Sequence, residues 1–198
     1  MSRTLVSPSA PKKHWQGQHR FEHWYRDNQC YFITAKARNS RPVFDDDGAK
    51  DVFWDRFEHW TDQFGFTPFV TSLLDNHYHT LGYLRVGANL GPMMQRLHGS
   101  VAKLVNDTLD RRHQPFWKDK GGRDYFDGCI RDEKQCRRAY RYTLIQSERH
   151  GLARDWRGYR HTKVVVDLEP AVWRCKRLGA FLEGVRYKRY DDRRRHAR

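Results

Sequence analysis

Two histidines in the middle of the chain, His77 and His79, have the spacing of a metal-binding pair. They stand in the run Asn76–Thr80 with hydrophobic residues on both sides, a pattern that predicts a β-strand. Side chains two positions apart in a strand project from the same face, so the two imidazoles should lie side by side. Neutral imidazoles placed in this way can hold a divalent metal ion. The alternative is that both are ordinary strand histidines, one of them paired with a carboxylate.

Two tyrosines, Tyr140 and Tyr142, stand in a later segment with helical periodicity. They differ by roughly 200° around a helix, so they cannot serve the same role. Tyr140 shares an apolar stripe with Cys136 and Leu144, and we expect it in the core. Tyr142 shares a polar stripe with Gln146, whose amide oxygen could reach the same site one turn on. Taken alone, Tyr142 is better explained as a surface tyrosine.

Hydrophobic periodicity predicts the elements that must position these residues. We expect three strands and three helices, and a strand or ribbon with a glycine turn before the last helix. The strands are expected at 30–37, 66–74 and 77–85, the helices at 45–64, 90–109 and 131–150, and the ribbon at 115–126. This order implies an α+β fold, a ferredoxin-like sandwich with an antiparallel β-sheet and helices packed on one face. The last helix is then an addition to that sandwich.

The composition indicates a protein that binds a phosphate-rich partner. The 198 residues carry a formal net charge of +14, which favours nucleic acid first and an anionic membrane surface second. No run approaches the roughly 18 apolar residues of a membrane span, and the first residues lack a signal-peptide apolar region. The four cysteines form no Cys-x-x-Cys pair, which fits a reducing cytosol.

We expect a basic flexible tail at 1–20, a catalytic domain at 21–160 and a basic C-terminal extension at 161–198.

Together the motifs resemble those of the single-tyrosine HUH transposases. The match is closer to the branch associated with REP elements (repetitive extragenic palindromes) than to the insertion-sequence enzymes. The family's Asn-His-hydrophobic-His matches residues 76–79, and its nucleophile helix matches the segment from Tyr142 to Leu152. The segments 94–106, 111–117 and 156–159 are also similar to the family. One departure is Gln146-Ser147, where many REP-associated members have Asn-Pro, since the glutamine instead matches the metal ligand of the insertion-sequence branch.

The resemblance implies a metal-dependent single-stranded DNA endonuclease and strand transferase. Tyr142 would be the catalytic nucleophile on an added catalytic helix, forming a 5′-phosphotyrosine intermediate. His77, His79 and Gln146 would hold Mg²⁺ or Mn²⁺, with open positions left for a phosphate oxygen. Zn²⁺ also binds such nitrogen ligands readily. The expected substrate is a hairpin of repeat DNA with a short guide sequence beside it.

Several residues outside the catalytic set are candidates for DNA contacts. Single-stranded DNA requires cations along its backbone and rings for base stacking. Trp117 and Tyr125 could stack on bases, although a core role for Trp117 is at least as plausible. The candidate phosphate contacts are Lys36, Arg38, Arg41, Arg111, Arg112, Lys118, Lys120 and Arg123. We expect a cytoplasmic, nucleoid-associated bacterial protein that is a monomer or a homodimer.

Three alternatives remain open from the sequence. The chain could be a non-catalytic hairpin-binding protein on the same scaffold. It could be a nickase of the rolling-circle replication type, although the spacing of Tyr140 and Tyr142 is wrong for two tyrosines on one face. A metal-dependent phosphodiesterase that attacks with water would form no covalent adduct.

Overall fold

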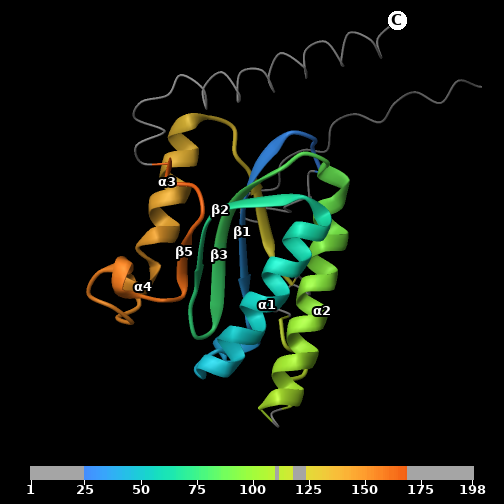
Figure 1. Cartoon of the computed structure of the whole chain (residues 1–198), viewed down its shortest axis with the longest axis vertical. Helices are drawn as coiled ribbons and strands as arrows, with labels where there is room; N and C mark the ends of the chain where they lie inside the picture. Colours follow the sequence, from blue (N-terminus) through green and yellow to red (C-terminus); the bar gives the residue numbers. More distant parts are fainter. Residues whose placement is uncertain (1–24, 110–111, 118–123, 169–198) are drawn as a thin grey trace, which may run out of the picture.

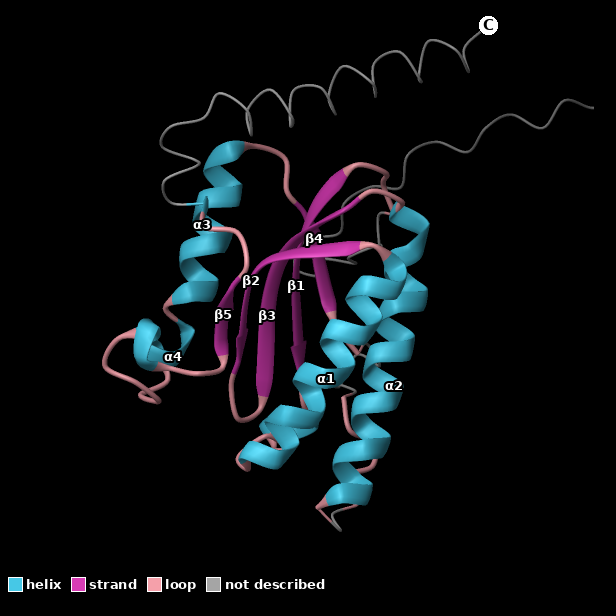
Figure 2. Cartoon of the chain, viewed as in Figure 1, coloured by secondary structure: helices cyan, strands magenta, loops and turns pink. Residues whose placement is uncertain are grey.

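A five-stranded antiparallel sheet forms the centre of the fold (Figures 1 and 2). The computed structural model describes residues 25–109, 112–117 and 124–168. The strand order is β4-β1-β3-β2-β5, and every neighbouring pair is antiparallel. The strands are β1 Gln29–Lys36, β2 Phe66–Leu73, β3 His77–Leu84, β4 Phe126–Cys129 and β5 Thr162–Val164.

Helices cover both faces of this sheet (Figure 1). The helices α1 (Asp47–Phe64) and α2 (Leu90–Thr108) pack on one face, and α3 (Glu133–Leu144) packs on the other. The alternation of side chains along β1 separates the two cores. Tyr31 and Ile33 belong to the cluster with α1 and α2, whereas Cys30 belongs to the cluster with α3. The predicted α+β fold with an antiparallel sheet and an added helix is therefore confirmed.

The helix ends follow from the residues found there. The Asp46 carboxylate caps α1 by accepting hydrogen bonds from the backbone nitrogens of Gly48 (2.7 Å) and Ala49 (3.3 Å). Gly65 ends α1 in the left-handed conformation at φ 70°, which favours glycine. Asp132 caps α3 by accepting from the backbone nitrogen of Gln135 at 2.7 Å.

The predicted single helix at 131–150 is wrong in one respect, because it is interrupted. It ends as α3 at Leu144 and resumes after Ile145 as the short α4 (Gln146–Arg149). At this point two side chains donate to backbone carbonyls and so compete with the N–H groups of the helix for these acceptors. The Thr143 hydroxyl donates to the Ala139 carbonyl at 2.9 Å, and the Gln146 side-chain nitrogen donates to the Tyr142 carbonyl at 2.7 Å.

Two further segments differ from the sequence prediction. Phe116 and Trp117 lie in no strand but are buried in the core, and β4 starts only at Phe126; residues 118–123 lie outside the described part. The ordered fold also reaches past residue 160, because β5 pairs with β2 and Leu168 is buried. Short 3-10 helices, η1 Arg38–Ser40, η2 Gly87–Asn89 and η3 Trp156–Gly158, complete the described elements.

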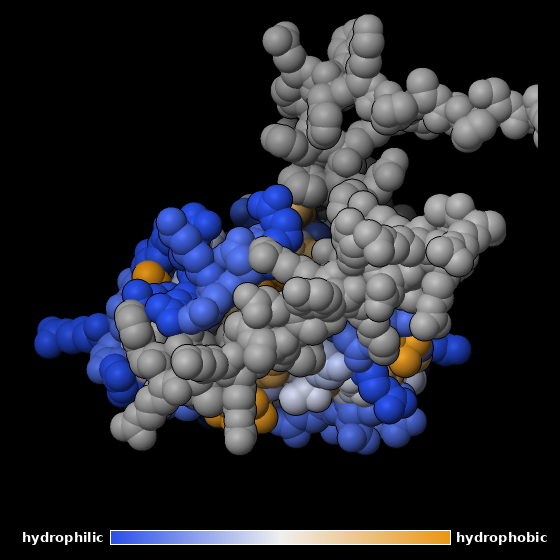
Figure 3. All heavy atoms as spheres, turned by 90° about the horizontal axis from the view of Figure 1, so that it is seen from above, coloured by the Kyte–Doolittle hydropathy of each residue, from blue (hydrophilic) through white to orange (hydrophobic). Residues whose placement is uncertain are grey.

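No helix in the described ranges is long and apolar enough to span a bilayer. Seen from above, the described surface is mostly hydrophilic, with a few separate apolar spots (Figure 3).

Candidate active site

The two histidines of β3 lie next to each other on the face that α3 covers. Their ring centroids are 5.0 Å apart, with the ring planes at 86°. Nδ1 of His77 lies 2.5 Å from the side-chain oxygen of Asn76, whose nitrogen donates to the Ser40 carbonyl. Nδ1 of His77 must therefore carry the proton, which leaves Nε2 with its lone pair. Nδ1 of His79 forms a hydrogen bond with the Thr34 hydroxyl at 2.7 Å, which holds the orientation of the second ring.

Both imidazoles are neutral near pH 7. Burial lowers the pKa of His77 to about 4, with smaller contributions from His150 and Lys36. Burial also lowers the pKa of His79 to about 3, with additional repulsion from His77, His150 and Arg149. A pair of neutral, oriented imidazoles is a suitable donor set for a divalent ion. In the described ranges no three His, Cys, Asp or Glu side chains form a metal-binding group.

Tyr142 reaches this pair from the last turn of α3. Its ring centroid lies 5.1 Å from that of His79, and its side chain is 38% exposed. Tyr140 is 2% exposed, and its hydroxyl donates to the Val166 carbonyl at 3.3 Å. The prediction that Tyr140 is a core residue and Tyr142 is accessible is therefore confirmed.

Gln146 is buried at the start of α4, with 1% of its surface exposed. Because its side-chain nitrogen donates to the Tyr142 carbonyl, its side-chain oxygen is the atom left to act as an acceptor. Within the described residues, Gln146 makes no hydrogen bond to either imidazole. Its role as a metal ligand stays a prediction.

Three neighbours of the site were given no role from the sequence. Phe32 stacks on His79 at 5.7 Å with an interplanar angle of 4°. The Arg149 guanidinium carbon lies 5.1 Å from the centroid of the Tyr142 ring, and the His150 ring lies 4.9 Å from that of His77. Arg149 follows Tyr142 by two helical turns, and this spacing indicates that the two side chains lie on the same side of the helix. Phe32 could be found only from the register of β1 against β3.

The predicted phosphate contacts are placed unevenly around this site. Lys36 is exposed at the end of β1 and faces His77 in the strand register. Arg38 and Arg112 are exposed, but Arg41 is engaged with the carbonyls of Arg38 and Pro115. Arg111, Lys118, Lys120 and Arg123 lie outside the described residues.

The two proposed stacking residues differ in burial. Trp117 is 4% exposed, and its indole nitrogen donates to the His98 carbonyl at 3.0 Å, so of its two suggested roles the core role is confirmed. Tyr125 is half-buried and packs against the same cluster.

Comparisons with known proteins support the fold assignment. No family model and no curated protein matches this sequence. The chain is similar to the solved structure of a REP-associated tyrosine transposase bound to a REP hairpin, with a TM-score of 0.60 and 14% identity over 73% of this chain and 82% of that one. A suspected transposase from Deinococcus radiodurans gives a TM-score of 0.42 and 16% identity over 66% of this chain and 95% of that one. The chain therefore has the fold of a REP-associated tyrosine transposase, as its motifs predicted.

Proposed function

We propose that this chain is a metal-dependent, transposase-like endonuclease and strand transferase that acts on single-stranded DNA beside hairpin-forming repeats. The observation that carries the proposal is the meeting of Tyr142 with the histidine pair. An accessible phenol lies 5.1 Å, centroid to centroid, from one of two neutral imidazoles. This arrangement supports strand cleavage because it brings a nucleophile next to two imidazoles that could hold a metal ion to neutralise phosphate charge.

In the proposed reaction Tyr142 supplies the attacking oxygen. Its phenolic oxygen forms a bond to the phosphorus of one DNA linkage and loses its proton to water. The bond from phosphorus to the 3′ oxygen breaks, and that oxygen leaves as a 3′-hydroxyl after taking up a proton. The 5′-phosphotyrosine remains a diester, so a free 3′-hydroxyl can attack it, restore a DNA linkage and release the tyrosine without ATP.

The surrounding side chains orient the reacting groups. Arg149 lies over the Tyr142 ring, while Phe32 contacts it edge-on at 5.9 Å between centroids. These contacts restrict the ring before the strand arrives, which lowers the entropic cost of reaching an in-line geometry. A Mg²⁺ or Mn²⁺ ion bound by His77, His79 and Gln146 would withdraw negative charge from the phosphate.

Charge and fold support the proposed substrate class. A net charge of +14 suits a polyanion. The solved relative is described as bound to a REP hairpin, and we propose the same class of DNA for this chain. We propose that it acts in the bacterial cytoplasm at the nucleoid, as a monomer or a homodimer.

The decisive experiment compares Tyr142→Phe with Tyr140→Phe. The wild-type chain, incubated with Mn²⁺ and a repeat-type hairpin carrying single-stranded flanks, is expected to form a covalent protein–DNA adduct. Tyr142→Phe should form none, while Tyr140→Phe removes only a buried hydroxyl and should retain it. An adduct that persists in Tyr142→Phe would overturn the assignment.

The metal is tested separately. EDTA or His77→Ala should stop cleavage while leaving much of the hairpin binding intact. If binding is lost in parallel, the histidines have a structural role. Binding without an adduct at any divalent metal would favour a non-catalytic hairpin-binding protein. The burial of Tyr140 argues against a nickase with a second tyrosine on this helix.

A further inference from the structure

A line of positive charge on α3 leads directly to Tyr142. Lys134, Arg138 and Tyr142 are spaced by four residues, so they lie on one stripe of the helix. All three side chains are exposed, whereas Cys136 and Tyr140 bury the opposite stripe against the sheet. Successive members are separated by about 6 Å along the helix axis. That step is comparable with the spacing of neighbouring phosphates in an extended DNA strand.

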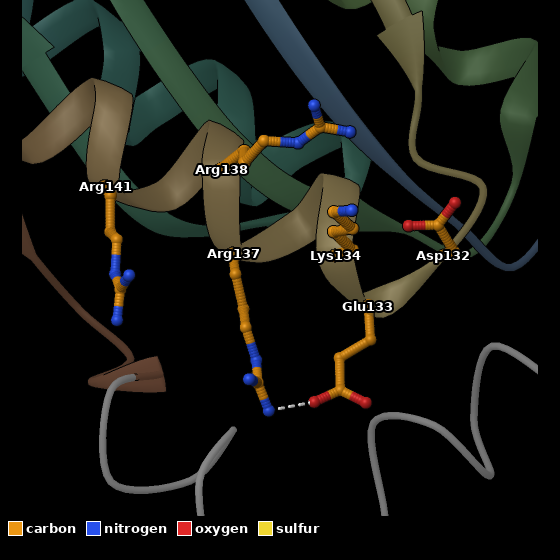
Figure 4. Close-up of a pocket in the computed structure, with 6 residues that line it drawn as sticks. All are labelled: Asp132, Glu133, Lys134, Arg137, Arg138 and Arg141. Atoms are coloured by element: carbon orange, nitrogen blue, oxygen red, sulfur yellow. Dashed lines mark hydrogen bonds and ion pairs between the residues drawn. The ribbon is translucent and has the colours of Figure 1, made fainter.

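The two cations of this stripe are not neutralised by neighbouring acids. Asp132 and Glu133 lie at the start of the same helix, but both have other partners. Asp132 caps the helix, and Glu133 is paired with Arg137, as the dashed line in Figure 4 shows. Neither Lys134 nor Arg138 forms an ion pair within the described ranges.

The surface around the stripe is hollowed and predominantly basic. A depression on the outer side of α3 is lined, as far as the chain is described, by four basic and two acidic side chains. These are Asp132, Glu133, Lys134, Arg137, Arg138 and Arg141, drawn in Figure 4. None of these six lining residues carries an aromatic ring that could stack on a base. It is therefore suited to the phosphate backbone rather than to reading sequence.

We propose that the Lys134–Arg138 stripe binds the backbone of the single strand that enters the active site, one phosphate for each cation next to the cleaved linkage. The inference rests on the proposed function, since Tyr142 fixes which phosphate is cleaved. Arg138 would neutralise the first neighbouring phosphate and Lys134 the second. The strand would then run along α3 on one side of the cut, with its bases turned away from the helix.

The test measures DNA binding by the full chain in a Tyr142→Phe background, so that no cleavage occurs. The probe is a repeat-type hairpin with single-stranded flanks. The double variant Lys134→Gln/Arg138→Gln should flatten the plot of log affinity against log salt by about 1.4, since each lost contact to a single strand contributes about 0.7. The matched control is Arg96→Gln/Lys103→Gln, which removes the same two residue types from the exposed side of α2. The control should leave the slope unchanged.

A second measurement locates the contacts on the DNA. Single phosphates of the flank are replaced one at a time by uncharged methylphosphonates. Two adjacent replacements on one side of the cleaved linkage should weaken binding by the parent chain but not by the double variant. The idea is overturned if the slope stays the same, if the control flattens it equally, or if no adjacent pair shows this dependence. Adduct formation by the wild-type chain on the same hairpin tests the proposed function independently of binding.

Discussion

At the scale of single residues, the site is prepared by hydrogen bonds behind the imidazoles. Asn76 and Thr34 each bond the Nδ1 atom of one histidine, so both rings are held in place, and Nε2 of His77 keeps its lone pair for a metal. Thr34 reaches His79 because β1 and β3 place the two residues directly opposite each other. The orientation of the rings is therefore built into the sheet before any ion binds.

This arrangement predicts a specific effect of Thr34→Val. The substitution preserves shape but removes the hydroxyl that fixes His79. We expect Mn²⁺ affinity, measured by calorimetric titration, to fall about 10- to 100-fold. Thr71→Val is the matched control. Thr71 lies on β2, two strands away from β1, and the substitution removes a buried hydroxyl that is bonded to Thr80. Equal affinities for Thr34→Val and the wild-type chain would show that Thr34 does not tune the metal site.

At the scale of elements, α3 determines where the nucleophile lies. Its apolar stripe packs Cys136, Tyr140 and Leu144 against the sheet, which turns Tyr142 toward the histidine pair. The helix is only 12 residues long, so its N-terminal cap contributes a substantial share of its order. Interruption after Leu144 then brings Arg149 back over Tyr142.

The cap predicts a difference between two substitutions of Asp132. Asp132→Ala should lower the free energy of unfolding by about 1 kcal/mol and increase amide hydrogen exchange in the first turn of α3. Asp132→Asn removes the same charge but still caps the helix, so it should stay close to the wild-type chain. If Asn destabilises as much as Ala, the charge of Asp132 matters rather than its hydrogen bond to Gln135.

Most elements could be predicted from the sequence because their signals are local. Runs of hydrophobic residues indicated β1 and β3, and the cap residues Asp46 and Gly65 explain the bounds of α1. The break after Leu144 could not be predicted, since it depends on where the Gln146 and Thr143 side chains donate. The three-residue β5 was too short to give a periodic signal, and it forms because β2 offers a free edge.

In the candidate site, too, some residues have a local sequence signal and others are placed only by tertiary contacts. The histidine pair and Tyr142 have a recognisable spacing, and the burial of Tyr140 follows from its stripe. The positions of Phe32 and His150 next to the histidines depend on strand register and on the path of the chain after α3. Such contacts become visible only when the tertiary structure is known.

At the scale of the whole molecule, one face of the sheet carries the candidate site and the other packs against the larger core. The face with α1 and α2 holds the larger core, and the strand that carries the site is anchored there through Tyr78. This residue stands between His77 and His79 but points to the opposite face. Its ring lies 4.8 Å from that of Phe53, and its hydroxyl is 3.0 Å from Nε2 of His98. The rigidity of the core is thereby transmitted to both imidazoles.

His98 predicts how global stability depends on pH. Complete burial lowers its pKa from 6.5 to about 3, so between these values the unfolded chain binds a proton that the native chain does not. The stabilisation is therefore fully present above pH 6.5 and is lost as the pH falls. Between about pH 7.5 and pH 5.5, this histidine should lower the free energy of unfolding by about 1.4 kcal/mol.

Denaturant unfolding across this pH range, with EDTA present, measures the effect. His98→Gln should remove about 1.4 kcal/mol of the pH-dependent loss, whatever its effect on stability at neutral pH. His59→Gln is the matched control, because His59 is an exposed histidine of α1 whose ring contacts only Trp60 among the described aromatic side chains. The remaining pH dependence should include contributions from His77, His79 and His161, whose pKa values are also lowered by burial. An unchanged slope in His98→Gln would mean that the buried imidazole takes up a proton in the native core, which its stacking on Trp117 at 4.3 Å and its bond to Tyr78 argue against.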